Sequence, residues 1–133
     1  MDRADSARMA AGFVLYAAMA PLAASDFGLE YDIDRVPATQ LSLADCALAI
    51  RRASAAAGYS TRTEQDQGRL VLHVAGPQGD GEALVSYCIQ AGTRTVWVVQ
   101  GLDYSGPGRS GAADVVKAVA AELRGAAGRS EAD

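Results

Sequence analysis

The two cysteines are the residues of this chain that are best suited to covalent chemistry. Cys46 and Cys88 make up the whole cysteine content, and a single pair is typical of one disulfide in an exported protein. The surrounding patterns place Cys46 on a helix and Cys88 on a strand, so a bond would fasten the helix to the sheet. In a reducing compartment the same side chains would be two buried thiols, and no Cys-x-x-Cys spacing indicates a redox role.

His73 is the only histidine, and its surroundings do not predict a catalytic or metal site. A zinc site needs several His or Cys ligands, and both cysteines are better used in the disulfide. A serine triad would need His73 together with a nucleophile motif that the sequence lacks. We expect His73 to lie on the solvent-facing side of its strand, beside Arg62 and Val71.

The segment Gly-Pro-Gly-Arg-Ser-Gly at 106–111 has the spacing G-x-G-x-x-G between a strand and a helix. A dinucleotide site needs a further parallel strand with an acidic residue about 20 positions on, and here the sequence ends after the helix. We therefore interpret the segment as a loop and expect no cofactor. Its last residues, Arg109, Ser110 and Gly111, form a weak candidate site for a small anion at the helix N-terminus.

Three carboxylates alternate with apolar residues between positions 27 and 36. This alternation is typical of a strand with one buried and one solvated side. Alternate strand residues lie about 6.7 Å apart, whereas calcium ligands usually come from a curled loop, so we predict a solvated acidic side and no bound metal. The side predicted to be buried holds Phe27, Leu29, Tyr31 and Ile33, and the solvated side holds Glu30, Asp32 and Asp34.

Residues 83–101 form the longest apolar run after the N-terminal segment, and Gly92-Thr93 at the centre predicts a type II′ hairpin turn. This turn places Cys88 opposite Trp97 and Tyr87 opposite Val98. Both faces of the hairpin are apolar, which is unusual for an antiparallel hairpin with one wet side. One face carries Leu84, Ser86, Cys88, Trp97 and Val99, and the other carries Val85, Tyr87, Ile89, Val96 and Val98.

Two helices and a second hairpin complete the pattern. Ser42 begins a helix that ends before Gly58, and residues 112–124 form a closing helix before a frayed tail at 125–133. The second hairpin covers residues 59–75 and turns at Gln67-Gly68. Alternation places its three residues Tyr59, Thr61 and Thr63 on the same face as Leu70, Leu72 and Val74.

The order β-α-β-β-β-β-α predicts an α+β fold. Helices that follow and precede antiparallel strands gather on one side of the sheet, so we expect a two-layer sandwich, with a five-stranded antiparallel sheet and both helices on one face. The order of elements resembles that of the TATA-binding-protein-like fold. This resemblance implies no DNA-binding function.

The charge balance excludes one class of partner. The chain has 133 residues, a formal net charge of −4 and no run of basic residues, whereas a nucleic-acid partner requires clustered basic surface. With 50% hydrophobic and 21% charged residues, the composition is that of one globular domain.

An uncharged apolar segment at residues 9–24 follows Arg3 and Arg8. Its 16 residues suit a signal peptide and fall short of the roughly 20 that span a bilayer. Small residues after it indicate cleavage, so we expect a signal peptide at 1–25, a domain at 26–124 and a periplasmic or secreted protein with no stable membrane span. Two aspartates make the first residues less positive, and the alternative is a retained helix packed on the fold or on a partner.

Three short stretches and the apolar leader carry a resemblance to a known group of proteins. They are Tyr-Asp-Ile-Asp-Arg-Val-Pro at 31–37, Leu-Ser-Leu-Ala-Asp-Cys at 41–46 and Val-Gln-Gly-Leu-Asp-Tyr at 99–104. In these stretches the chain resembles short exported bacterial proteins of a domain family of unknown function. The resemblance implies a periplasmic location and a two-layer fold, and it implies no activity.

These expectations together predict a working surface. If Cys88 faces the helices, the opposite face of the hairpin stays apolar and uncovered, and such patches usually mark an interface or a ligand groove. We expect an exported, non-enzymatic binding or protein-interaction module that dimerises through this face or binds a protein partner. The alternatives are a small-molecule or lipid binder that uses the face as a groove wall and, third, a small hydrolase-type enzyme. The predicted interface residues are Val85, Tyr87, Ile89, Val96 and Val98.

Overall fold

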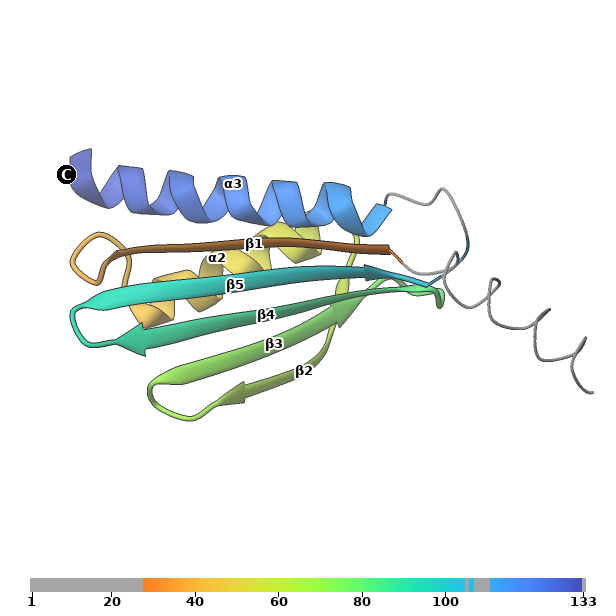
Figure 1. The fold of residues 1–133 in the computed structure, drawn as a ribbon, viewed down its shortest axis with the longest axis horizontal. Helices are drawn as coiled ribbons and strands as arrows, with labels where there is room; N and C mark the ends of the chain where they lie inside the picture. Colours follow the sequence, from red (N-terminus) through yellow and green to blue (C-terminus); the bar gives the residue numbers. More distant parts are fainter. Residues whose placement is uncertain (1–27, 105, 107–110, 133) are drawn as a thin grey trace, which may run out of the picture.

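The computed structural model describes residues 28–104, 106 and 111–132. The predicted leader, Phe27, Arg109 and Ser110 lie outside the described residues. None of the described helices combines the length and the apolar character that a bilayer span requires. The elements are β1 (Gly28–Pro37), α2 (Leu43–Ala56), β2 (Ser60–Asp66), β3 (Leu70–Gly76), β4 (Glu82–Ala91), β5 (Arg94–Asp103) and α3 (Gly111–Ala132), in the predicted order (Figure 1).

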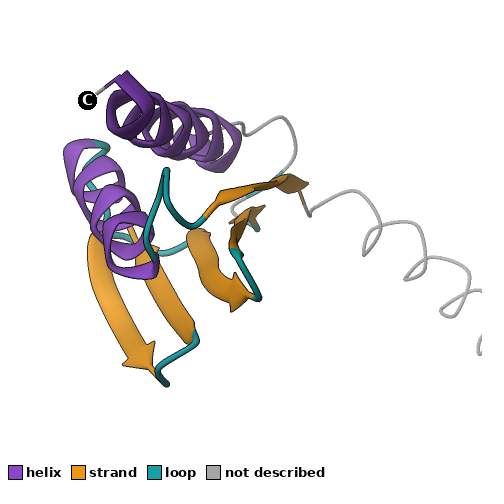
Figure 2. Ribbon diagram, turned by 90° about the vertical axis from the view of Figure 1, so that its left-hand side faces the viewer, coloured by secondary structure: helices purple, strands orange, loops and turns teal. Residues whose placement is uncertain are grey.

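The strands form one antiparallel sheet in the order β1-β5-β4-β3-β2, and both helices lie on the same side of it (Figure 2). The predicted α+β two-layer arrangement is therefore confirmed. The β4–β5 hairpin has the predicted register, with Cys88 opposite Trp97 and Tyr87 opposite Val98. Gly92 at its turn has a φ of 62°, which a residue with a side chain rarely adopts.

The core lies between the sheet and the helices. Trp97 is fully buried at its centre, with Leu84 and Val99 beside it on the helix side of β4 and β5. α3 approaches β5 closely because Gly101 has no side chain. A Cβ atom at Gly101 would lie 2.7 Å from the carbonyl oxygen of Ala112 and from a methyl group of Val116.

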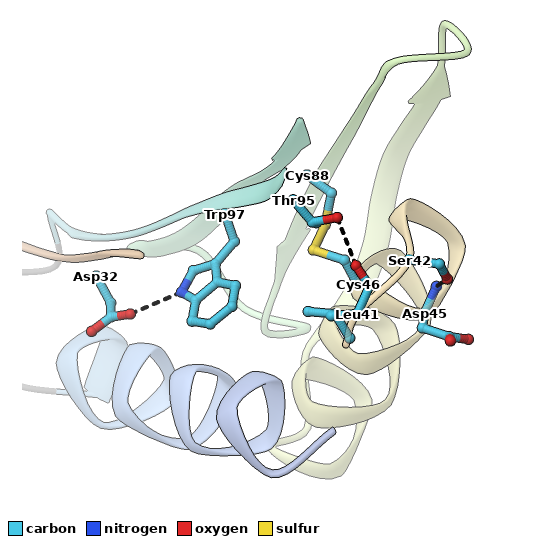
Figure 3. The surroundings of a disulfide bond; sticks show 8 residues. All are labelled: Asp32, Leu41, Ser42, Asp45, Cys46, Cys88, Thr95 and Trp97. Atoms are coloured by element: carbon cyan, nitrogen blue, oxygen red, sulfur yellow. Dashed lines mark hydrogen bonds between the residues drawn. A yellow bond between two sulfur atoms is a disulfide. The ribbon is translucent and has the colours of Figure 1, made fainter. Parts of the chain in front are cut away.

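Both ends of α2 have the residues that the sequence predicted. The hydroxyl of Ser42 accepts a hydrogen bond of 3.0 Å from the backbone N–H of Asp45, which satisfies one of the free donors of the first turn. Gly58 follows the helix with a φ of 84°. The loop before α2 is fixed to the sheet because the buried hydroxyl of Thr95 donates a hydrogen bond to the carbonyl of Leu41 (2.6 Å, Figure 3).

A disulfide joins Cys46 of α2 to Cys88 of β4 (Figure 3). Both residues are buried, and their Cα atoms are 6.1 Å apart, within the usual range for a bonded pair. The bond closes a loop between residues 42 positions apart, for which the chain-entropy model gives about 4 kcal/mol of stabilisation. The bond between helix and sheet that the sequence suggested is present.

The two sides of β1 are the reverse of the prediction. Leu29, Tyr31 and Ile33 point away from the helices and are 55%, 61% and 58% exposed, whereas Asp32 and Asp34 point to the helix side, where Asp34 lies opposite Trp97.

Polar contacts explain this orientation. The indole N–H of Trp97 donates to Asp32 (3.0 Å, Figure 3), and the guanidinium of Arg124 in α3 binds Asp32 at 3.0 Å and Asp34 at 3.3 Å. The same guanidinium lies 5.7 Å from the centre of the Trp97 ring. Because β1 is an edge strand, its helix side is only partly enclosed, and carboxylates with these partners fit there better than apolar side chains.

Two further boundaries differ from the sequence expectation. α3 continues to Ala132 instead of ending at residue 124, because Ala127 is buried in the core and Arg129 pairs with Glu122 at 3.0 Å. In β2 a register shift lies between Thr61 and Thr63, so these two residues are on opposite faces of the sheet. Tyr59 and Thr61 are therefore on the helix side, and the prediction that they share the face of Leu72 was wrong.

Replacing Arg124 tests how strongly charges hold β1 to α3. The side chain is about half exposed, so solvent screening limits each ion pair to a few tenths of a kcal/mol, and the stacking on Trp97 adds about 0.5 kcal/mol. Arg124→Gln should therefore lower the free energy of unfolding by about 1 kcal/mol in urea denaturation followed by Trp97 fluorescence.

Arg129→Gln is the matched control, because its partner Glu122 lies in the same helix and its loss should cost less than about 0.5 kcal/mol. In an Asp32→Asn background the effect of Arg124→Gln should be smaller. Equal effects of Arg124→Gln in the two backgrounds would show that the Asp32 contact carries no stability.

Candidate functional site: the outer face of the sheet

The outer face is the side of the sheet that points away from α2 and α3 (Figure 2). Register and alternation define its members on four strands. No helix or strand among the described residues covers it. Its members are Leu29, Tyr31, Ile33 and Arg35 of β1, Arg94, Val96, Val98, Gln100 and Leu102 of β5, Val85, Tyr87 and Ile89 of β4, and Leu70, Leu72 and Val74 of β3.

The five predicted interface residues all lie on the outer face and are half-buried by one another. Tyr87 pairs with Val98 and Ile89 with Val96 across the hairpin, and β3 places Leu72 beside Tyr87. Such directly opposed side chains support each other on a sheet. The structure therefore brings together the residues that the sequence grouped.

Sequence reasoning missed the three most exposed apolar members of the face, Leu29, Tyr31 and Ile33. Alternation shows that they share one side of a strand, but it does not show which side meets the helices. The partners of the acidic side, Trp97 and Arg124, are 65 and 92 positions from Asp32, so no local pattern indicated them.

A shallow hollow of about 370 Å³ lies on the outer face between β1 and β5, lined by Ile33, Asp34, Arg35 and Val96. Ile33 and Val96 give it an apolar floor, and Arg35 stands at its side. The carboxylate of Asp34 is bound by Arg124 on the helix side.

Charge is distributed unequally between the two sides of the sheet. On the outer face the only charged strand positions are Arg35 and Arg94, and neither guanidinium has a partner among the described residues. Arg62, at the β2 bulge, donates hydrogen bonds to the carbonyls of Pro77 and Gly79. The acidic residues of the strands all take helix-side positions, namely Glu30, Asp32, Asp34, Glu64, Asp66, Glu82 and Asp103.

His73 is buried on the helix side, with 2% of its surface exposed, and the prediction of a solvent-facing histidine was wrong. Because Val71 lies opposite Cys88, the disulfide turns Val71 and His73 together toward α2. Nε2 of His73 is 2.9 Å from the hydroxyl of Thr61. Burial lowers the pKa of His73 from its ordinary value of 6.5, Arg51 lowers it further, and Glu64 opposes them.

Of the three residues predicted for an anion site at the start of α3, only Gly111 is among the residues that the structure describes. The carboxylate of Glu82 lies against Gly111, where an added Cβ would meet it, and it also accepts a hydrogen bond of 2.7 Å from the hydroxyl of Tyr59. Burial and this carboxylate raise the pKa of Tyr59. Within the described residues no cluster of His, Cys, Asp and Glu is arranged to hold a metal ion.

Acid should destabilise the fold through His73. Well above pH 6.5 the imidazole is neutral in both the folded and the unfolded chain. As the pH falls below 6.5 the unfolded chain takes up a proton that the buried His73 resists, so stability falls by up to about 1.4 kcal/mol per pH unit until the folded pKa is reached. His73→Gln should flatten this part of a plot of unfolding free energy against pH between 7.5 and 5.5. The same slope in the variant would show that other groups cause it.

Comparison with known proteins places the chain in a family. No curated protein is significantly similar to it in sequence. The sequence model of a family of unknown function, DUF6180, matches residues 26–128. The match includes all five strands, α2 and most of α3, and the chain therefore belongs to the family of unknown function DUF6180.

Proposed function

We propose that the domain is an exported, non-enzymatic binding module that uses the outer face to associate with an apolar surface outside its own chain. The observation that carries the proposal is the row of Leu29, Tyr31 and Ile33, each more than half exposed, beside the apolar side chains of β5, β4 and β3. Monomeric proteins rarely leave a continuous apolar surface of this kind in water without a use for it.

Two kinds of occupant fit such a face. A second copy of the chain would pack sheet against sheet, as in a sandwich whose core is formed by two inner faces. A lipid or another small amphiphile would use the face as one wall of its site, and the hollow beside Arg35 favours this second candidate.

Export is the second part of the proposal, and the disulfide supports it, because structural disulfides are rare in reducing compartments. The family match begins at residue 26, so the apolar segment at 9–24 lies outside the shared domain. A buried helix-to-sheet bond is also useful to a domain of this size, whose core alone gives modest stability.

Export predicts a definite mass. The full chain, expressed in a Gram-negative host and recovered from the periplasm, should begin near Asp26 and carry no thiol that alkylates without reductant. Intact mass spectrometry before and after reduction measures both properties in one sample. A chain that retains its first 25 residues in the cytosol, with Cys46 and Cys88 both alkylated, would contradict export.

The outer face should bind an uncharged apolar dye in the native state. We expect Nile red fluorescence to rise with the folded chain starting at Asp26, and the double substitution Tyr31→Ser and Ile33→Ser to remove most of the increase. Both side chains are more than half exposed, so the variant should unfold within about 1 kcal/mol of the parent.

Light scattering completes this experiment. If the outer face already holds a second copy, the parent will be a dimer that excludes the dye, and the double variant will be a monomer. If the parent is a monomer, the absence of dye binding, or a variant that binds as much dye as the parent, would show that the outer face is not a binding surface.

A further inference from the structure

We propose that the outer face, if it is the binding surface described above, docks onto a lipid bilayer that carries anionic headgroups. The inference rests on the charge of that face. Its strand positions hold Arg35 and Arg94 without any acid, although the chain as a whole has a net charge of −4. Both arginines lie at the end of the face nearest the β4–β5 turn, and a cationic end beside an apolar surface complements a layer of anionic headgroups above acyl chains.

The arrangement along β1 matches this kind of surface. Leu29, Tyr31 and Ile33 follow one another over about 13 Å, and Arg35 continues the line at the end near the β4–β5 turn. Leucine and isoleucine can enter the upper acyl region, tyrosine is favoured at the headgroup level, and arginine can extend to phosphate while its stem stays in apolar surroundings. Arg94 lies diagonally beside Arg35, on the next strand of the same face.

The edge of the sheet limits how deeply the domain can enter. β1 is the last strand of the sheet that the structure describes, so no described strand pairs with its second edge, and backbone groups without a partner are not tolerated in the hydrocarbon region. Only side chains of the outer face can therefore enter the bilayer, and the strand itself must remain in the hydrated interfacial layer.

The same charges make a second copy a poorer occupant. In a face-to-face dimer the arginines of one chain would meet outward-facing strand positions that carry no acidic residue, so these positions would supply no ion pair across the interface. Direct pairing of two β1 edges would bring Glu30, Asp32 and Asp34 of both chains together on the helix side, and inward-pointing charges of this kind oppose edge association.

The position of β1 directly after the apolar leader is also consistent with membrane docking. The apolar segment ends at residue 24 and β1 begins at Gly28, and four residues span at most about 14 Å. While the leader is attached to a bilayer, β1 is therefore the element of the domain that is held nearest to it.

Vesicle flotation tests the proposal with the chain that starts at Asp26. We expect binding to vesicles of phosphatidylglycerol and phosphatidylcholine in equal parts, weak binding to pure phosphatidylcholine, and a loss of binding as the ionic strength rises. A basic residue near an anionic surface contributes about 1 kcal/mol. Arg35→Gln with Arg94→Gln should therefore reduce partitioning about 30-fold.

The matched control removes two positive charges from the helix side, with Arg52→Gln in α2 and Lys117→Gln in α3. Both residues are exposed, and the control has the same net charge as the test variant, so its partitioning should change less than threefold. The double substitution of Tyr31 and Ile33 with Ser should reduce partitioning at least tenfold through lost apolar burial.

The outcomes separate this inference from the proposed function. Equal losses in the charge variant and its control, or equal binding to both kinds of vesicle, would overturn the lipid docking. Dye binding that depends on Tyr31 and Ile33 without any vesicle binding would also overturn it, while the outer face would remain a binding surface. A dimer that the Tyr31 and Ile33 variant dissociates would show that a second copy is the occupant instead.

Discussion

The bond between Cys46 and Cys88 determines the orientation of most of the sheet. Side chains alternate along a strand, so fastening Cys88 to α2 places every second residue of β4 on the helix side and the rest on the other. The register then extends this choice to β5 through Trp97 and to β3 through Val71. The buried position of His73 and the outward-facing, half-buried position of Tyr87 both follow from it.

β1 obeys a different constraint, because it is an edge strand that α3 covers only in part. Burying Leu29, Tyr31 and Ile33 there would gain the free energy of apolar burial. The opposite orientation instead gives Asp32 a hydrogen bond from Trp97 and an ion pair with Arg124. A fully buried indole N–H without an acceptor would cost about 1–3 kcal/mol. The orientation that satisfies Trp97 leaves the apolar side of β1 in water.

These two constraints together create the outer face and its charge. The apolar residues of β1 continue the apolar residues of β5, β4 and β3 without interruption, and the acidic residues are withdrawn to the helix side, where Arg124, Arg51 and Tyr59 bind several of them. Arg35 and Arg94 remain on the outer face. A chain with an acidic net charge thus presents one apolar surface with a cationic end, and that surface is the basis of the proposed function.

The sequence by itself determined the element order, the two helix caps of α2, the register of the β4–β5 hairpin and the choice of partner for each cysteine. All of these depend on residues that are close along the chain or, for the disulfide, on there being a single pair. Only the tertiary structure decided the orientation of β1, the burial of His73 and the length of α3. Those features depend on contacts such as Asp32 with Arg124 and Ala127 with the core. Such contacts join distant segments and leave no periodic signal in the sequence. Alternation could therefore show which residues of β1 share a side, but not which side meets the helices.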